Sequence, residues 1–233
     1  MAGAGDVDGD GLDDLLIGAY GDDTNGSTAG AVYVVYGAIT GDLDLSDYDV
    51  KILGEDGADQ AGYAVSGAGD ADGDGLADLL IGANTDESGG GNAGAAYLVL
   101  GGVSGESSLA DVAAAELIGE SGADYAGWSV SGAGDVNGDD LDDLLIGAYG
   151  DDDNGSNAGA AYLVLGGVSG PLDLSAADAK LRGDGGSDYA GRAVAGGGDV
   201  NDDGLGDLLV GAYGEDSGGS AAGAVYVILG GGY

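Results

Sequence analysis

Four segments of the chain place oxygen-bearing side chains on alternate residues of a glycine-rich loop. The first is 6-DVDGDGLDD-14, and the same spacing returns at residues 70–78, 135–143 and 199–207. Side-chain oxygens at the first, third and fifth residues of a tight loop converge on one point. The seventh residue can add its backbone carbonyl, and a carboxylate at the ninth can close the shell. This pattern is typical of a site for Ca²⁺, a hard cation that takes about six to eight oxygen ligands.

The predicted ligands form four sets, called loops 1 to 4 below. They are Asp6, Asp8, Asp10, Leu12 and Asp14; Asp70, Asp72, Asp74, Leu76 and Asp78; Asp135, Asn137, Asp139, Leu141 and Asp143; and Asp199, Asn201, Asp203, Leu205 and Asp207. Asn at the third position of loops 3 and 4 keeps a side-chain oxygen but carries no charge. A metal site tolerates this change, because the oxygen can still bind the ion. The alternative, solvated Asp-Gly turns in an acidic protein, gives no reason for this choice. We therefore expect about four Ca²⁺ ions.

A helix-loop-helix calcium site is excluded by the twelfth position of each loop. An EF-hand carries Glu there, whereas this chain has Ile17, Ile81, Ile146 and Val210. These residues belong to apolar runs such as 15-LLIGA-19, which are short, rich in branched residues and bounded by Gly and Asp. Such runs predict β-strands.

The loops belong to a repeat of about 64 residues. The marker Gly-x-Gly-Asp begins at Gly3, Gly67, Gly132 and Gly196, which are 64, 65 and 64 residues apart. Each unit has an AGYAV-like run, the acidic loop, LLIGA, a second acidic loop, a run such as 30-GAVYVVYG-37, and a segment such as 50-VKILG-54. Four short strands in such a unit indicate one blade of a β-propeller. A solenoid fits poorly, because the repeating coils of solenoids are much shorter than this repeat of about 64 residues.

We therefore predict a single all-β domain over residues 1–233, a propeller of about four blades that are four-stranded antiparallel sheets. The repeats cover approximately residues 1–60, 61–125, 126–189 and 190–233, with the first and last blades incomplete. A short helical turn is expected only within 105–119. The second strand of the first blade and the third strand of the last are expected to lack partners, and open apolar edges favour pairing. Two alternatives remain: completion by a longer array, or a homo-oligomer formed through these edges.

Composition excludes several classes of function. The chain has 43 Asp and Glu against 4 Lys and Arg, a net charge of −39, and neither His nor Cys. Nucleic-acid binding requires a basic footprint, so no nucleic acid is expected as a partner. Thiolate zinc sites, disulfides and His-dependent triads are also excluded. The longest apolar run, 222-AGAVYVILG-230, is too short for membrane insertion. Paired carboxylates are typical of glycosidases, but nothing singles out one pair, so we expect no enzyme.

The order of these motifs resembles the FG-GAP repeats of the integrin alpha-subunit propeller and its bacterial relatives, over essentially the whole chain. The FG position is 62-GY-63, 127-GW-128 and 191-GR-192, and the GAP position is 18-GAY-20, 82-GAN-84, 147-GAY-149 and 211-GAY-213. Phe and the family's proline are therefore lost, and four repeats are fewer than the usual seven. The resemblance implies calcium in loops on one face of a propeller and a role in adhesion or ligand binding. It also implies an extracellular or cell-surface protein, whose signal peptide is not present in this chain.

Two features outside the calcium loops have alternative interpretations. The remaining acids gather in the loops of the opposite face, where they form either a second ligand surface or a merely solubilising one. Tyr20, Tyr149 and Tyr213 either stack on a sugar or replace the family's proline in packing. Two functions therefore remain: a non-catalytic calcium-binding adhesion module for an unknown protein or carbohydrate ligand, and a purely structural repeat or self-assembling unit of a large surface protein.

Overall fold

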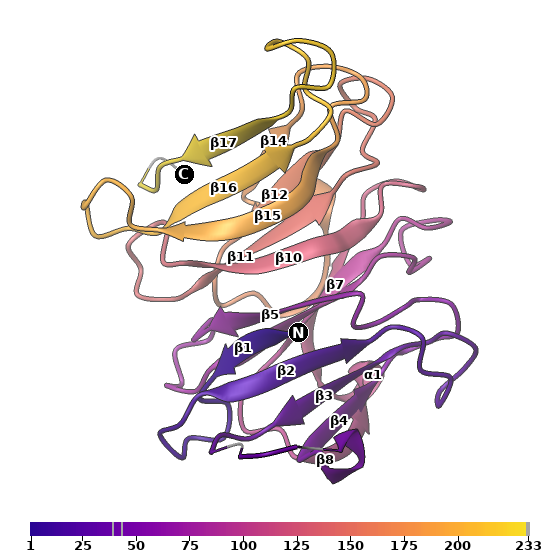
Figure 1. Cartoon of the computed structure of the whole chain (residues 1–233), viewed down its shortest axis with the longest axis vertical. Helices are drawn as coiled ribbons and strands as arrows, with labels where there is room; N and C mark the ends of the chain where they lie inside the picture. The colour runs from indigo at the N-terminus through magenta and orange to yellow at the C-terminus, as the bar shows by residue number, and fades with distance from the viewer. Residues whose placement is uncertain (39, 43, 232–233) are drawn as a thin grey trace.

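The computed structural model describes residues 1–38, 40–42 and 44–231. These residues form four β-sheets, one for each repeat, with almost no helix. Figure 1 shows the sheets following one another in chain order from the bottom of the molecule to the top. The expected all-β architecture, a partial propeller of about four blades, is confirmed.

The first two sheets each have five strands. Sheet 1 has the order β1-β2-β3-β4-β8, with β1 at Ala2–Gly5, β2 at Asp14–Ala19, β3 at Ala31–Val35, β4 at Val50–Leu53 and β8 at Gly105–Ser108. Sheet 2 has the order β5-β6-β7-β9-β13, with β5 at Ala64–Gly69, β6 at Asp78–Ala83, β7 at Ala95–Val99, β9 at Ala113–Ile118 and β13 at Gly170–Asp173.

The last two sheets are smaller. Sheet 3 has the order β10-β11-β12-β14, with β10 at Ala126–Gly134, β11 at Asp143–Ala148, β12 at Ala160–Val164 and β14 at Ala179–Arg182. Sheet 4 has the order β15-β16-β17, with β15 at Ala190–Gly198, β16 at Asp207–Ala212 and β17 at Ala224–Ile228. The inner strands β1, β5, β10 and β15 pack against one another from sheet to sheet.

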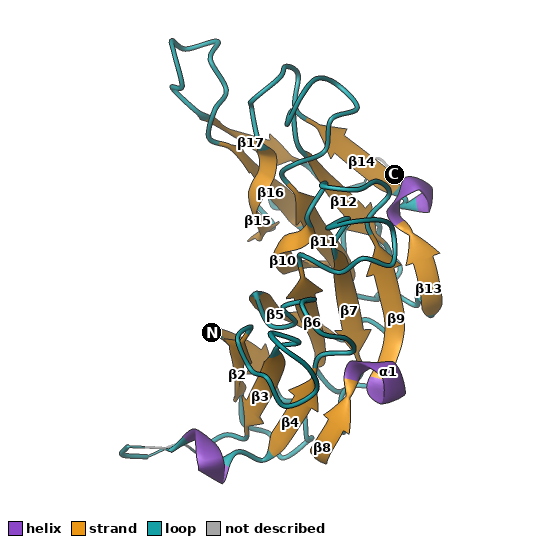
Figure 2. Ribbon diagram, turned by 90° about the vertical axis from the view of Figure 1, so that its right-hand side faces the viewer, coloured by secondary structure: helices purple, strands orange, loops and turns teal. Residues whose placement is uncertain are grey.

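Sheets 1 and 2 differ from the expected four antiparallel strands. Their fifth strands, β8 and β13, come from the following repeat and pair in parallel with β4 and β9. An outer strand leaves one row of backbone donors and acceptors unpaired, and the connection to the next outer strand covers that row. The second and third repeats therefore each close the sheet before them as well as building their own (Figure 2).

Two further expectations need correction. The second strand of the first repeat does have a partner, because Ala2–Gly5 forms β1 and pairs with β2. The expected helical turn is α1 at Leu109–Val112, but 3₁₀ turns also occur at Leu45–Asp47 and Leu174–Ala176. In both 3₁₀ turns the preceding aspartate caps the turn by accepting the backbone N–H two residues later.

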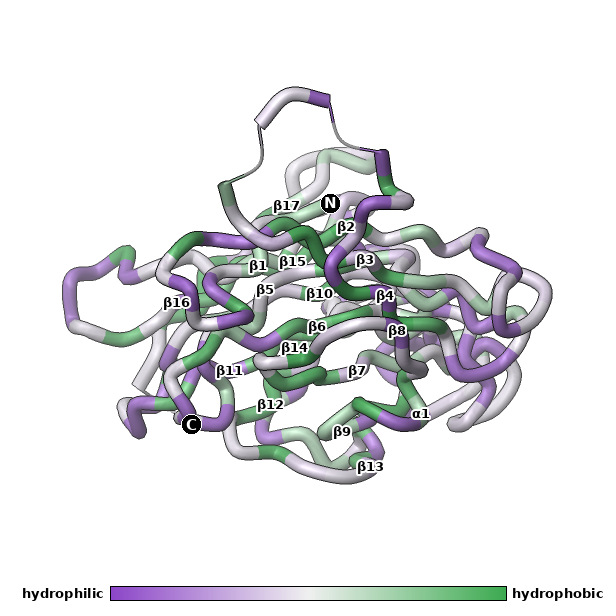
Figure 3. The backbone as a smooth tube through the Cα atoms, turned by 90° about the horizontal axis from the view of Figure 1, so that it is seen from below, coloured by the Kyte–Doolittle hydropathy of each residue, from purple (hydrophilic) through white to green (hydrophobic). Residues whose placement is uncertain are grey.

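Apolar side chains fill the space between successive sheets. One cluster joins sheets 1 and 2 around Leu16, Ile81 and Tyr97, and another joins sheets 2 and 3 around Leu80 and Tyr162. Strands β6, β7, β11 and β12 are buried on both faces, which explains why their sequences are continuous apolar runs rather than alternating ones. Figure 3 shows hydrophobic residues along the strands and hydrophilic ones mainly in the loops.

Candidate metal sites

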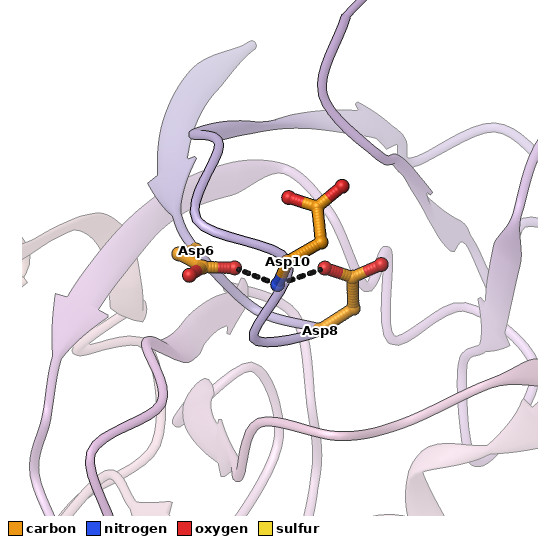
Figure 4. Close-up of side chains that lie close together, drawn as sticks. All are labelled: Asp6, Asp8 and Asp10. Atoms are coloured by element: carbon orange, nitrogen blue, oxygen red, sulfur yellow. Dashed lines mark hydrogen bonds between the residues drawn. The ribbon is translucent and has the colours of Figure 1, made fainter.

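Each acidic loop connects the inner strand of a sheet to its second strand, and local hydrogen bonds shape it. In loop 1 the backbone N–H of Asp10 donates to Asp6 Oδ1 and to Asp8 Oδ1, both at 3.0 Å (Figure 4). The N–H of Leu12 donates to Asp10 Oδ1 at 2.8 Å. Carboxylates at the first, third and fifth positions therefore organise the backbone around them, as Asx turns do.

The first aspartate of the loop accepts several backbone N–H groups. Asp6 accepts from Gly9, Asp10 and Gly11 at 2.8–3.0 Å. Asp135 does the same in loop 3, and these backbone donors hold the pKa of its carboxyl below the usual value even though burial acts in the opposite direction. An ionised carboxylate is favoured at this position, which suits a metal ligand.

The fourth and sixth loop residues have positive φ in all four copies. Glycine occupies most of these positions, but Asp202 (φ 58°) and Asp140 (φ 69°) replace it in loops 4 and 3. Asp and Asn tolerate this left-handed conformation better than other side chains do. The two substitutions therefore keep the turn.

The ninth residue of each loop is a buried aspartate that fastens the loop to the sheet. Asp78 accepts from the N–H of Ala71 at 2.9 Å and of Gly101 at 2.8 Å, so it joins loop 2 to the end of β7. Asp14, Asp143 and Asp207 make the same pair of contacts. Burial raises the pKa of Asp78 to about 6 and also raises the pKa of Asp14 and Asp143.

Carboxylate oxygens converge in loops 1 and 2. One oxygen each from Asp6, Asp8 and Asp10 lie within 4.8 Å of one another, and the same holds for Asp70, Asp72 and Asp78. Two oxygens bound to one Ca²⁺ at about 2.3–2.6 Å lie at most about 5 Å apart. The donor set contains only oxygen, the ligand type that Ca²⁺ prefers. These residues therefore fit a divalent cation.

Loops 3 and 4 repeat the backbone geometry with Asn at the third position. Asn137 Oδ1 accepts from the N–H of Asp139 at 2.8 Å, and Asn201 Oδ1 accepts from that of Asp203 at 3.1 Å. Each amide also donates to the fifth-position carboxylate, at 2.9 and 2.8 Å. The side chains at the third and fifth positions thus contact each other in both loops, whereas the three-carboxylate groups described above belong to loops 1 and 2 and do not include Asp14 or Asp74.

The leucines at the seventh position connect neighbouring loops through their side chains. A methyl group of Leu76 lies over Gly9 of loop 1, Leu141 lies over Gly73, and Leu205 lies over Gly138. Leu12, in the first loop, is 45% exposed. Ligation by the backbone carbonyls of these four leucines stays a prediction.

Backbone hydrogen bonds also join each of loops 1 to 3 to the next sheet. The N–H of Ala77 donates to the Asp6 carbonyl at 2.9 Å, and that of Gly102 donates to the Val7 carbonyl at 2.7 Å. Equivalent bonds reach loop 2 from sheet 3 and loop 3 from sheet 4. A cation that stiffens one loop therefore also stiffens the contact between two sheets.

Sequence reasoning missed the ion pairs at the opposite face. Lys51 Nζ lies 2.9 Å from Asp22, whereas Lys180 pairs with Asp151, Asp153 and Glu120. Two features of the sequence could have indicated these ion pairs. Lysine is rare in this chain, and Lys51 and Lys180 both lie in the outer strand of their repeats. Part of the acid at this face is therefore paired rather than freely solvated.

The aromatic residues of the GAY and FG positions form a row. Trp128 lies between Tyr63 and Tyr149, with ring centroids 4.7 and 4.5 Å away. Arg192 lies over Trp128, Tyr149 and Tyr213 at 4.9–5.4 Å. Tyr149 thus packs inside the row, whereas Tyr20 and Tyr213 are about half exposed.

Comparison with known proteins identifies the repeats. A family model for the FG-GAP repeat matches residues 2–35, 126–164 and 190–228. Integrin alpha-X of Homo sapiens is 42% identical over 106 residues, which are 43% of this chain and 9% of that protein. Integrin alpha-5 of Xenopus laevis is 33% identical over 154 residues (64% of this chain and 14% of that protein). Integrin alpha-PS2 of Drosophila melanogaster is 35% identical over 157 residues (63% and 11%).

The match therefore covers at most 14% of the length of any of these three relatives. None of the helices in the described part of the chain has the length and hydrophobicity that crossing a membrane requires. The second repeat lies outside the matched segments, yet its loop 2 has the same oxygen spacing and its sheet the same strand order. On the strength of its matched repeats, its integrin-alpha relatives and its sheet architecture, the chain belongs to the FG-GAP repeat family.

Proposed function

We propose that this chain is a non-catalytic, calcium-binding module of the extracellular space that takes part in adhesion or ligand binding. The observation that carries the proposal is the convergence of three carboxylates within 4.8 Å in loops 1 and 2, with the same backbone geometry in loops 3 and 4. Three carboxylates this close repel one another unless a cation lies between them. The likeness to integrin alpha chains supports the adhesion role.

Calcium acts in this proposal as a clamp on the molecule. The loops are joined to the neighbouring sheets by backbone hydrogen bonds, so neutralising their charge strengthens the contacts between sheets. The surface that binds a protein or carbohydrate ligand then belongs to a set of sheets that calcium holds rigidly together. The chain's own residues orient the cation, and no bond is made or broken in a substrate.

Calcium titration calorimetry tests the metal sites. We expect about four ions per chain, and Asp10→Ala and Asp139→Ala should each remove one. The matched control is Asp13→Ala, an exposed acid of loop 1 whose counterpart in loop 2 is already Ala77. Equal loss of stoichiometry in all three variants would show that general acidity, not ligation, attracts the ions.

The alternative function, a structural or self-assembling repeat of a larger surface protein, is favoured by the apolar edge of β17, where Val225 and Val227 are exposed. Immobilised extracellular-matrix proteins and a glycan array separate the two functions. Calcium-dependent binding supports adhesion. Calcium-dependent self-association without any such binding supports the structural role.

A further inference from the structure

A lysine ammonium lies among acidic side chains in sheet 3, at the face opposite loops 1 to 4. Lys180 of β14 pairs with Tyr162 of β12. Its ammonium contacts three carboxylates, those of Asp151, Asp153 and Glu120. In sheet 1 the lysine of β4 makes the same kind of contact with an aspartate. The outer strand of both sheets thus places a cation among the acids of the neighbouring loops.

In sheet 2 the counterparts of these three acids line a single pocket. They are Asp86, Ser88 and Glu55, at the same positions of the repeat, and the pocket has a volume of about 300 Å³. The residue that pairs with Tyr97 is Glu116 rather than a lysine. Among the described residues that line the pocket, none is basic. Sheet 2 therefore keeps two of the three acids at this place and adds a further acid where sheet 3 has the ammonium.

Two of the carboxylates that line this pocket are buried. Asp59 is 6% exposed and Asp86 is 3% exposed. Asp59 Oδ2 accepts from the N–H of Asp56 at 2.9 Å, whereas Asp59 Oδ1 receives no hydrogen bond from the described residues. Burial of a charged group is costly unless the group is paired and hydrogen-bonded. An oxygen of Asp59 therefore lies in the pocket without the partner that its burial requires.

The neighbouring side chains supply too few donors for these acids. The Tyr97 hydroxyl lies 2.9 Å from Asp86 and 3.3 Å from Glu55, but a phenol has a single proton to donate. Glu116 has a buried oxygen without a hydrogen-bond partner. It lines a second cavity, of about 160 Å³, and Glu55 lines both cavities. Three carboxylates thus share one hydroxyl proton at this place.

The pKa of Asp59 reflects the same excess of negative charge. Burial, and then the charges of neighbouring acids, Asp86 first among them, raise it to about 6. In sheet 3 burial also raises the pKa of the corresponding Asp124, but the charge of Lys180 acts in the opposite direction. A cation in the pocket of sheet 2 would act on Asp59 as Lys180 acts on Asp124.

The spacing of the acids favours an ammonium over a divalent metal ion. In the described part of the chain, three carboxylate oxygens converge within 4.8 Å in loops 1 and 2 and around Lys180, but not in the pocket of sheet 2. Oxygens that bind one Ca²⁺ lie at most about 5 Å apart. An ammonium makes hydrogen bonds of about 2.7–2.9 Å to carboxylates, so it reaches oxygens that lie farther apart. Sheet 3 shows this group bound at the equivalent place.

We propose that the pocket lined by Glu55, Asp59 and Asp86 binds a primary ammonium group from outside the chain. The ammonium takes the place that Lys180 Nζ takes in sheet 3. It has three N–H donors, which serve the three carboxylates, and its alkyl chain leaves the pocket past the exposed Ser88. A free alkylamine and a lysine side chain of a partner protein both carry this group. The site lies at the face opposite loops 1 to 4, so it is independent of the proposed calcium sites.

Amide NMR of the full chain in saturating calcium tests the proposal, with n-pentylamine and a blocked Gly-Lys-Gly peptide as probes. We expect saturable shifts in residues 55–59 and 86–88, with a Kd on the order of 1 mM, and none with the neutral n-pentanol. Glu116→Lys should abolish binding, because its own ammonium then serves the pocket. Asp86→Asn should weaken binding about tenfold or more. Asp13→Asn removes the same charge at an exposed site and should leave binding unchanged.

The two probes distinguish the sources of the ammonium. Equal affinities indicate a free amine, whereas about tenfold tighter binding of the peptide indicates the lysine of a partner; both results support the proposal. Three results would overturn it. One is the absence of shifts with both probes. Another is equal binding by the parent chain and Glu116→Lys. The third is displacement of the amine by added calcium with shifts at the same amides, because the pocket would then bind an inorganic cation. None of these results changes the count of ions in loops 1 to 4.

Discussion

At the scale of single residues, position 116 distinguishes sheet 2 from its neighbours. Glu116 pairs with Tyr97 where Lys51 and Lys180 pair with their tyrosines. The Tyr97 hydroxyl lies 2.9 Å from Asp86 and 3.3 Å from Glu55, and Glu116 has a buried oxygen without a hydrogen-bond partner. Burial, followed by the charges of Asp86 and Glu55, raises the pKa of Glu116. Three acids therefore meet where sheets 1 and 3 have an ammonium.

We expect Glu116→Lys to stabilise the protein. The ammonium would lie beside Asp86 and Glu55, and charge-assisted hydrogen bonds contribute about 1.5–3 kcal/mol each. The measurement is the denaturant midpoint at fixed calcium. Glu116→Gln is the matched control, since it removes the repulsion without adding a cation. If Lys gains no more than Gln does, the added ammonium makes no useful contact.

Asp124 gives the molecule a dependence on pH. Burial, and then the charges of Asp151 and Glu120, raise its pKa to about 7, whereas an unfolded Asp loses its proton near pH 4. Between these values the folded state binds more protons than the unfolded state. The contribution of Asp124 to stability is therefore present at low pH and declines as pH rises through about 7.

Asp124→Asn should remove this decline. Relative to the parent chain, the variant should gain unfolding free energy as pH rises from about 4 to 8, because its amide never ionises and can still accept from the N–H of Ser121. Denaturant unfolding at several pH values and fixed calcium measures the difference. Asp13→Asn, at an exposed site, is the control: its unfolding free energy should change with pH in the same way as that of the parent chain. A constant offset between Asp124→Asn and the parent would contradict the assignment.

At the scale of elements, glycines set how closely the sheets approach. Gly82 of β6 and Gly211 of β16 occupy the same repeat position. An added Cβ at Gly82 would clash with the carbonyl of Gly127, whereas at Gly211 the nearest atom, the carbonyl oxygen of Ala193, is 3.4 Å away. Neither has a positive φ, so the difference between them is one of space alone. Contact between sheets, rather than strand conformation, explains the glycine in sheet 2.

We expect Gly82→Ala to cost about 1–3 kcal/mol or more, the usual range for overpacking a core. Backbone on both sides leaves no flexible side chain to move aside. Gly211→Ala is the matched control and should leave the unfolding free energy nearly unchanged, because its nearest neighbour is 3.4 Å away. Chemical denaturation of both variants makes the comparison. Equal losses would mean that strand propensity, not sheet contact, sets the cost.

At the scale of the whole molecule, charge and calcium oppose each other. A net charge of −39 favours expansion through self-repulsion, and four Ca²⁺ would change it by +8, to −31. The loops are the places where this repulsion is most concentrated. Since loops 1 to 3 are each bonded to the next sheet, relief of the repulsion in these loops acts on the contacts between all four sheets.

Removing calcium should therefore destabilise the protein strongly. Extracellular calcium modules bind with Kd roughly 10⁻⁴–10⁻³ M, so about 10 mM calcium adds roughly 1.4–2.7 kcal/mol for each site. Four independent sites give roughly 6–11 kcal/mol, which is comparable to the stability of a domain. Thermal melting with calcium, with excess EDTA, and with magnesium at equal ionic strength measures the effect. A melting temperature unchanged by EDTA would contradict it.

The sequence by itself determined the features that depend on residues close together in the chain. The oxygen spacing of the loops was readable because the shaping hydrogen bonds join residues at most five apart, such as Gly11 to Asp6. The strands were readable from short apolar runs, and the repeat from its period. Loop shape and strand identity are thus local properties.

Tertiary structure decided the features that join one repeat to another. The parallel strands β8 and β13 cover the preceding sheets, Lys180 reaches Glu120 from 60 residues away, and Leu76 covers loop 1. The clamping contacts of Asp78 span 7 and 23 residues. No local sequence pattern encodes these contacts, because they depend on the rotation and displacement of each sheet relative to the preceding sheet. That geometry is set by the glycines and apolar side chains packed between the sheets.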